Sequence, residues 1–228
     1  RAIVSAGNVT VHTECRIDAE GMRRLSEEYG AVYVAIGAQG GKTLKLEGAD
    51  AEGVMSAVDL LTKIGDDEYP DFTGKNVVVI GGGNVAMDCA RTSVRAGAAS
   101  VTVAYRRRLE DMTALRAEID SAMQEGVEMM TLQAPDHIEV ENGQAVALYT
   151  QPQFIGPVKR GRPAPQKADK PLVRVPADVV LIAVGQDIES APFEEAGMQA
   201  DRTYFEADDG LKSVGSLDNV FVGGDCQV

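Results

Sequence analysis

The stretch that decides the fold is residues 77–88, which run Val77-Val78-Val79-Ile80-Gly81-Gly82-Gly83-Asn84-Val85-Ala86-Met87-Asp88. A short run of β-branched residues leads into a glycine cluster, and an amphipathic segment follows at once. This order predicts a strand, a tight turn and a helix. The spacing Gly-x-Gly-x-x-Ala, with Gly81, Gly83 and Ala86 at its fixed positions, is typical of a dinucleotide-binding turn.

Each position of this fingerprint has a physical task. Gly81 allows the sharp turn, Gly83 lets the backbone approach a pyrophosphate, and Ala86 lets the helix lie close to the strand. The N–H groups that open the helix, at Asn84 and Val85, would then face the phosphates. We therefore predict a dinucleotide site here. The competing interpretation is a glycine-rich turn between strand and helix that binds no ligand.

The segments after the turn continue the alternation of helix and strand. Apolar residues at helical spacing predict a helix over residues 84–96, which Gly97 ends. Residues 100–105 then form the next predicted strand. A further helix is expected over 114–125, with Thr113 as its N-cap.

The end of the strand at 100–105 indicates which dinucleotide binds. An NAD site usually has Asp or Glu there to hold the ribose hydroxyls. This chain instead has Tyr105-Arg106-Arg107-Arg108. Because Arg presents a bidentate fork to phosphate oxygens, we predict that Arg106 and Arg107 bind the 2′-phosphate of NADPH, with Arg108 a weaker candidate. The alternative is a solvated basic corner that pairs with Glu110 and Asp111.

Two other apolar runs end in glycine, at residues 31–37 and 177–185, and a third, at 219–225, ends in Gly223-Gly224-Asp225. In flavoproteins that bind two dinucleotides, strand ends of this kind mark the crossovers between an FAD domain and an inserted NAD(P)H domain. One such strand is weak evidence, since many buried strands end in glycine. Their order along this chain is more specific.

In this order the chain resembles the small subunit of NADPH-dependent glutamate synthase and its relatives. These include the NADPH/FAD part of dihydropyrimidine dehydrogenase and the electron-bifurcating transhydrogenase subunit, within the pyridine nucleotide-disulfide oxidoreductase superfamily. The matching segments are Ala35-Ile36-Gly37-Ala38, residues 81–88, Tyr105-Arg106-Arg107, Ala183-Val184-Gly185 and Gly223-Gly224-Asp225-Cys226.

The resemblance implies an α/β fold. We expect a Rossmann-like NAD(P)H-binding domain of the two-dinucleotide-binding flavoprotein type, with remnants of the FAD domain. The implied boundaries are residues 1–46 for one part of the FAD-binding domain, 47–184 for the NADPH-binding domain and 185–228 for the second FAD part. The family's own FAD fingerprint and iron–sulfur cysteines do not occur in the sequence, so we expect a fragment of a larger flavoprotein, inactive alone.

The resemblance also implies the chemistry. A hydride would pass from NADPH to FAD, and electrons would continue to an iron–sulfur protein or a partner subunit. The cofactors carry this reaction, so no side chain is expected to act as an acid, base or nucleophile, and no metal ligand is assigned. Gly185 would lie near the nicotinamide end, and Asp225 would bind FAD in the full-length protein.

Composition excludes several other classes of function. The 228-residue chain has a formal net charge of −13, which argues against nucleic acid or an anionic membrane as a partner. No apolar run approaches the roughly 20 residues of a membrane span, and no signal peptide is visible, so we expect a cytoplasmic protein.

The three cysteines show no CxxC spacing, which argues against a disulfide redox pair or a metal cluster within this chain. Cys89 is expected on the inner face of its helix as a small core residue, and Cys226 is expected to pack rather than to react. His12 and His137 lie far apart in the sequence and are expected to be structural.

Residues 151–176 are rich in proline and in basic side chains. We expect a surface loop between antiparallel strands; the alternative is a docking site for an acidic partner. Two rival functions also stay open for the chain as a whole. One is a catalytically silent nucleotide-binding or interaction module. The other is a stand-alone NAD(P)-dependent dehydrogenase, for which no proton-transfer residue is visible.

Overall fold

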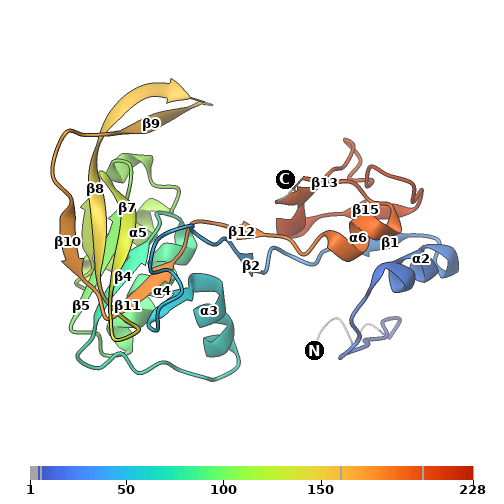
Figure 1. Cartoon of the computed structure of the whole chain (residues 1–228). Helices are drawn as coiled ribbons and strands as arrows, with labels where there is room; N and C mark the ends of the chain where they lie inside the picture. The colour runs from blue at the N-terminus through green and yellow to red at the C-terminus, as the bar shows by residue number, and fades with distance from the viewer. Residues whose placement is uncertain (1–4, 6, 160, 202, 228) are drawn as a thin grey trace. The chain divides into compact units, whose positions relative to one another are not determined.

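A computed structural model describes residues 5, 7–159, 161–201 and 203–227 (Figure 1). The chain folds as two compact units, one made of residues 1–39 and 187–228 and the other of residues 40–186. It passes from the first unit to the second at β2 (Gly40–Gly41) and returns at β12 (Gln186–Asp187). The sequence placed the first boundary between residues 46 and 47. In the structure the second unit already begins at Gly40, because Leu44 and Leu46 pack against one of its core clusters.

The centre of the larger unit is a five-stranded parallel sheet with the strand order β3-β11-β4-β5-β6. Its strands are β3 (Val54–Ser56), β11 (Val179–Ile182), β4 (Asn76–Ile80), β5 (Ser100–Tyr105) and β6 (Glu128–Thr131). The predicted strands at 77–80 and 100–105 are therefore present and are neighbours in the sheet. Parallel pairing places their carboxyl ends at one edge.

Helices cover one face of this sheet. They are α3 (Ala57–Gly65), α4 (Asn84–Arg95) and α5 (Arg116–Gln124), with a short 3-10 turn, η1 (Leu109–Asp111), between β5 and α5. Successive side chains of a strand point to opposite faces, so Val77 and Val79 of β4 pack with the helices, in one cluster with Met87 and Ile119. This explains why β4 is apolar at every inner position: both of its faces are covered.

A second, antiparallel layer covers the other face, where Val78 and Ile80 pack against Ile138 and Leu148. Its strands pair in the order β10-β8-β7, with β9 on β8 beyond them. Their bounds are β7 (Gln133–Glu141), β8 (Gln144–Lys159), β9 (Arg162–Lys167) and β10 (Val173–Pro176). Figure 1 shows β8 and β9 extending together as a hairpin.

The expectation of a loop over residues 151–176 is therefore wrong for most of that segment. Pro163 and Pro165 lie in β9, opposite Val158 and Ile155, and among the described strands β9 pairs with β8 alone. An edge strand tolerates proline because one of its sides needs no N–H donors. Of the basic residues in this segment, Arg160 lies outside the described residues.

The smaller unit contains short elements. They are α2 (Ala19–Glu28), β1 (Val32–Val34), α6 (Ala191–Ala196), β13 (Ala200–Asp201), β14 (Tyr204–Phe205), β15 (Val220–Val222) and η2 (Gly224–Cys226). β1 and β15 pair in parallel, although almost 190 residues of sequence separate them. Met22, Phe193 and Phe205 are buried together between these strands and the helices. The side chain of Asp18 accepts the Gly21 N–H and caps α2.

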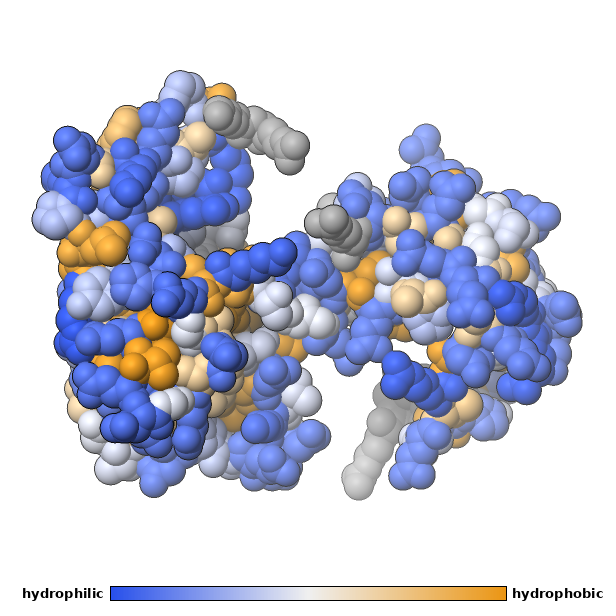
Figure 2. All heavy atoms as spheres, viewed as in Figure 1, coloured by the Kyte–Doolittle hydropathy of each residue, from blue (hydrophilic) through white to orange (hydrophobic). Residues whose placement is uncertain are grey.

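Hydrophilic residues cover most of the surface seen in Figure 2, and hydrophobic residues appear there only in small groups. None of the helices in the described ranges is long and apolar enough to cross a membrane.

The cysteines differ sharply in their environments. Cys15 is exposed, whereas Cys89 and Cys226 are buried. The thiol of Cys89 lies 3.8 Å from the Ala57 carbonyl oxygen, and burial raises its pKa to about 12. A thiolate forms only as the pH approaches the pKa, so roughly one Cys89 in ten thousand is ionised at pH 8.

We therefore expect one thiol per native chain to react rapidly with Ellman's reagent at pH 8, and three to react in guanidinium chloride. Replacing Cys15 with Ser should remove the rapid phase. Rapid reaction of two or three thiols in the native chain would contradict the burial of Cys89 and Cys226.

Candidate nucleotide-binding site

The glycine turn after β4 is held from both sides. The Gly81 N–H donates to the Ala104 carbonyl oxygen of β5 at 3.2 Å, and the Ala183 N–H, just after β11, donates to the Ile80 carbonyl oxygen at 2.8 Å. Gly81 has a φ of +153°, and a Cβ there would collide with the carbonyl oxygen of Ala183. Glycine is therefore required both by the backbone angle and by the close approach of β11.

Helix α4 starts directly at this turn. Its N-cap is Gly83, which has no side chain to cap the helix, and the N–H groups of Ala86 and Met87 turn back to the Gly83 carbonyl oxygen. The N–H groups of Asn84 and Val85, the two residues before Ala86, have no partner within the helix. They open a helix of 12 residues, and its positive dipole end favours an anion at this point.

The side chain of Asn84 has another task. Its Oδ1 accepts the Leu115 N–H at 2.8 Å, so it holds the segment before α5. The N-cap of α5 is Leu115, not Thr113, and the prediction for Thr113 is wrong. Instead, the Thr113 N–H donates to the Gly82 carbonyl oxygen at 2.9 Å, which places Thr113 beside the glycine turn.

Tyr105, the last residue of β5, packs on the glycine turn. A Cβ at Gly82 would lie 2.5 Å from a carbon of the Tyr105 ring, so this glycine leaves room for the ring. The Tyr105 hydroxyl donates to the Asp111 carbonyl oxygen at 2.8 Å. Tyr105 therefore connects the glycine turn to the arginines that follow it in the sequence.

The three arginines after Tyr105 have different environments. Arg108 forms an ion pair with Asp111 through two hydrogen bonds of 2.9 and 3.1 Å, and this contact lowers the pKa of Asp111. The Nε of Arg107 donates to the Pro163 carbonyl oxygen of β9 at 2.9 Å. Within the described ranges no hydrogen bond or ion pair occupies the exposed side chain of Arg106. The alternative of a self-paired basic corner thus describes Arg108, not Arg106 or Arg107.

The loop after β11 brings Gly185 to the same edge of the sheet. Gly185 has a φ of +116°, and its carbonyl oxygen accepts the Lys42 N–H at 3.1 Å. A Cβ at Gly185 would lie 3.4 Å from the Cδ of Lys42, so the lysine side chain runs along this glycine.

The glycine turn, the end of β5 and the loop after β11 all contribute residues to one cavity of about 570 Å³ within the larger unit. It lies at the carboxyl ends of the parallel strands, where open α/β sheets bind ligands. The cavity brings together Gly81, Gly83, Asn84, Val85, Arg106, Arg107 and Gly185 of the predicted site. Ala86 is fully buried against the core and supports the helix rather than the cavity wall.

The charge of this cavity is opposite to that of the chain. Lys42, Arg106, Arg107 and Arg162 line it, and none of the described lining residues is Asp or Glu. The chain as a whole carries −13. A concave, basic cavity on an acidic chain selects an anionic ligand, because it concentrates positive potential where the rest of the surface repels.

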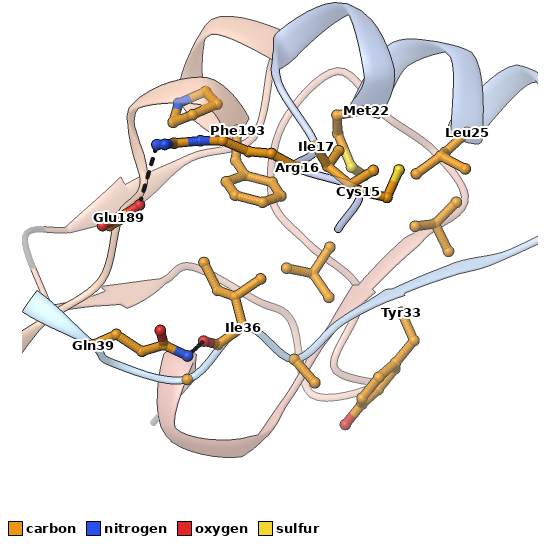
Figure 3. A pocket seen from close by; sticks show the side chains of 15 residues that line it. Cys15, Arg16, Ile17, Met22, Leu25, Tyr33, Ile36, Gln39, Glu189 and Phe193 are labelled. Atoms are coloured by element: carbon orange, nitrogen blue, oxygen red, sulfur yellow. Dashed lines mark hydrogen bonds and ion pairs between the residues drawn. The ribbon is translucent and has the colours of Figure 1, made fainter. Parts of the chain in front are cut away.

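The smaller unit has its own cavity, of about 530 Å³, shown in Figure 3. Met22, Leu25, Ile36 and Phe193 give it a largely apolar lining, and at its rim Arg16 pairs with Glu189 at 3.5 Å. This cavity shows no basic cluster comparable to that of the larger unit.

Asp225 does not line that cavity. It is exposed in η2, directly after the carboxyl end of β15. Gly224 before it has a φ of +70° with open space around its Cα, so a ligand can approach the backbone there. An exposed carboxylate at a strand end fits the binding of ligand hydroxyls. Helix α2 of this unit is capped by Asp18, and this carboxylate disfavours a phosphate at the start of that helix.

The chain matches the family model of the pyridine nucleotide-disulphide oxidoreductases over residues 4–228, and it belongs to that family. The small chain of NADPH glutamate synthase from Halomonas elongata is 35% identical over 188 residues, covering 78% of this chain and 40% of that protein. The beta subunit of NADP(+)-dependent formate dehydrogenase from Moorella thermoacetica is 31% identical, covering 97% of this chain and 32% of that protein. The chain thus spans less than half the length of these relatives.

Among solved structures, Mycobacterium tuberculosis FprA in complex with NADPH aligns with a TM-score of 0.70 at 20% identity, covering 90% of this chain and 60% of FprA. These comparisons confirm the predicted α/β fold of the two-dinucleotide-binding flavoprotein type. They also confirm the predicted resemblance to the glutamate synthase small subunit.

The cavity wall also contains residues that were not predicted from the sequence, among them the polar side chains of Lys42, Thr113 and Arg162. Thr113 carried a usable signal, since it closely follows the arginines at the tip of β5. Lys42 and Arg162 carried none, because they reach the cavity only through the pairing of distant segments.

Proposed function

We propose that this chain is the NADPH-binding part of a flavin-dependent oxidoreductase of the glutamate synthase small-subunit type. The observation that carries the proposal is the basic cavity at the glycine turn, which combines the N-terminus of α4 with one lysine and three arginines, while none of its described lining residues is acidic. A pyrophosphate and a 2′-phosphate together supply the negative charge that such a cavity selects.

The roles of the residues follow from their places in the cavity. Gly81, Gly83 and the N–H groups of Asn84 and Val85 would hold the pyrophosphate at the start of α4, with Ala86 keeping that helix close to β4. Arg106 and Arg107 would bind the 2′-phosphate, because neither guanidinium is neutralised by a carboxylate of the described residues. Gly185 would lie near the nicotinamide, at the end of the cavity lined also by Lys42.

The chemistry beyond NADPH belongs to the whole protein. We propose that it carries FAD, which accepts a hydride from NADPH, and that electrons continue to an iron–sulfur domain or a partner subunit in the cytoplasm. Asp225 would contribute one contact to FAD. This chain's task is then to bind and orient the nicotinamide nucleotide, since the two cofactors carry the hydride transfer themselves.

Calorimetric titration of the 228-residue chain with NADPH and NADH, at one fixed salt concentration, tests this function. We expect NADPH to bind more tightly than NADH, because only NADPH carries the phosphate that the arginines recognise. Tighter binding of NADH would overturn the arginine assignment. Binding of neither nucleotide would favour the rival interpretation of an interaction module.

The rival functions are separated by a different measurement on the full-length protein. A yellow preparation that reduces a dye with NADPH would support the flavoprotein. A colourless, inactive full-length protein would support the silent module, and NADPH oxidation without bound flavin would support a stand-alone dehydrogenase.

A further inference from the structure

The hairpin formed by β8 and β9 contributes to the nucleotide cavity, although it lies far from the fingerprint in the sequence. Arg162, the first residue of β9, lines the cavity together with Arg106 and Arg107. Its guanidinium donates to the Asp111 carbonyl oxygen at 2.8 Å, which ties the hairpin to the segment that follows the arginines.

A second contact joins the same two segments. The next residue along β9, Pro163, accepts a hydrogen bond from the Nε of Arg107 at 2.9 Å. Pro163 is held in turn by its place opposite Val158 in the hairpin. The hairpin therefore both orients Arg107 and brings Arg162 beside it.

Arg162 keeps most of its capacity to bind an anion. A guanidinium has five N–H donors, and the bond to the Asp111 carbonyl oxygen uses one of its nitrogens. The carboxylate of Asp111 does not neutralise Arg162, since it is paired with Arg108 instead. The side chain of Arg162 is exposed at the cavity, and no described acidic residue lines that cavity.

We propose that Arg162 is a third guanidinium for the 2′-phosphate of NADPH, delivered by the β8–β9 hairpin. A dianionic phosphate has enough oxygens for more than one bidentate arginine. The hairpin would thus contribute to the selectivity for NADPH over NADH. This inference rests on the proposed function, because it concerns the same nucleotide.

The test compares Arg162→Gln with the unchanged chain in titrations with NADPH, NADH and adenosine 2′,5′-bisphosphate. We expect Arg162→Gln to weaken the binding of NADPH and of the bisphosphate on the order of 10- to 100-fold, because one hydrogen-bonded charge contact is lost. The affinity for NADH should stay nearly unchanged. The NADPH affinity of Arg162→Lys should lie between those of the unchanged chain and Arg162→Gln, since lysine keeps the charge but loses the bidentate fork. Lys167→Gln, on the same strand but away from the cavity, is the matched loss of charge and should have little effect.

The possible outcomes distinguish a failure of the role of Arg162 from a failure of the proposed function. If the unchanged chain prefers NADPH and Arg162→Gln leaves that preference intact, the role of Arg162 is wrong and the proposed function stands. Equal weakening of NADPH and NADH would show that Arg162 only holds the hairpin in place, and would also overturn the inference. If the unchanged chain shows no preference for NADPH, the proposed function fails and the role of Arg162 fails with it.

Discussion

Replacing Gly81 with Ala is expected to abolish nucleotide binding and to destabilise the larger unit by about 3–5 kcal/mol. Two effects add at this position. The φ of +153° is a conformation that a residue with a Cβ rarely adopts, and the new methyl group would collide with the carbonyl oxygen of Ala183. Relief requires β4 and β11 to separate, and this would break the hydrogen bond between the Ala183 N–H and the Ile80 carbonyl oxygen.

Urea unfolding measures the loss of stability, and titration of the folded variant with NADPH measures the loss of binding. Gly126→Ala is the matched control, because Gly126 also has a positive φ, +96°, but open space around it. We expect this control to cost only the backbone strain, about 1 kcal/mol, and to keep NADPH binding. Equal destabilisation by the two substitutions would contradict the close approach of Ala183 as the main cause.

The double substitution Arg106→Ala and Arg107→Ala is expected to weaken the binding of NADPH far more than the binding of NADH. Each arginine would contribute a charge-assisted contact of about 1.5–3 kcal/mol that exists only with the 2′-phosphate. Together they predict a loss on the order of 10²- to 10⁴-fold for NADPH, measured by calorimetry at fixed salt. Because the contacts are charge-assisted, raising the salt concentration should narrow the difference between the unchanged and the substituted chain.

The control for this double variant is Arg95→Ala with Arg116→Ala, which removes the same charge away from the cavity. Arg95 pairs with Glu125, and Arg116 pairs with Asp120 on α5. We expect that control to leave the preference for NADPH in place. Arg106→Ala alone is also informative, since Arg107 additionally holds the hairpin through Pro163. Equal weakening of NADPH and NADH by the double variant would refute the assignment of the 2′-phosphate site.

The local sequence was sufficient to predict the centre of the fold. The run from Val77 to Ile80 has no polar position, which requires a strand covered on both faces, and the structure covers it with helices on one side and β7–β8 on the other. Gly81, Gly83 and Ala86 predicted the turn into α4, and Tyr105 marked the end of β5. These predictions succeeded because strand alternation, turn conformation and helix capping depend on residues within a few positions of one another.

Tertiary structure alone decided the rest of the cavity wall. Lys42 reaches Gly185, and Arg162 reaches Asp111, across more than 50 residues of sequence in each case. Residues 151–167 show the reason: their prolines predicted a loop, but pairing at the edge of β8 made β9 a strand and carried Arg162 to the cavity. The sequence by itself therefore determined the sheet, the glycine turn and the arginines at the tip of β5. Which distant side chains complete the cavity was set by long-range strand pairing, which no local pattern encodes.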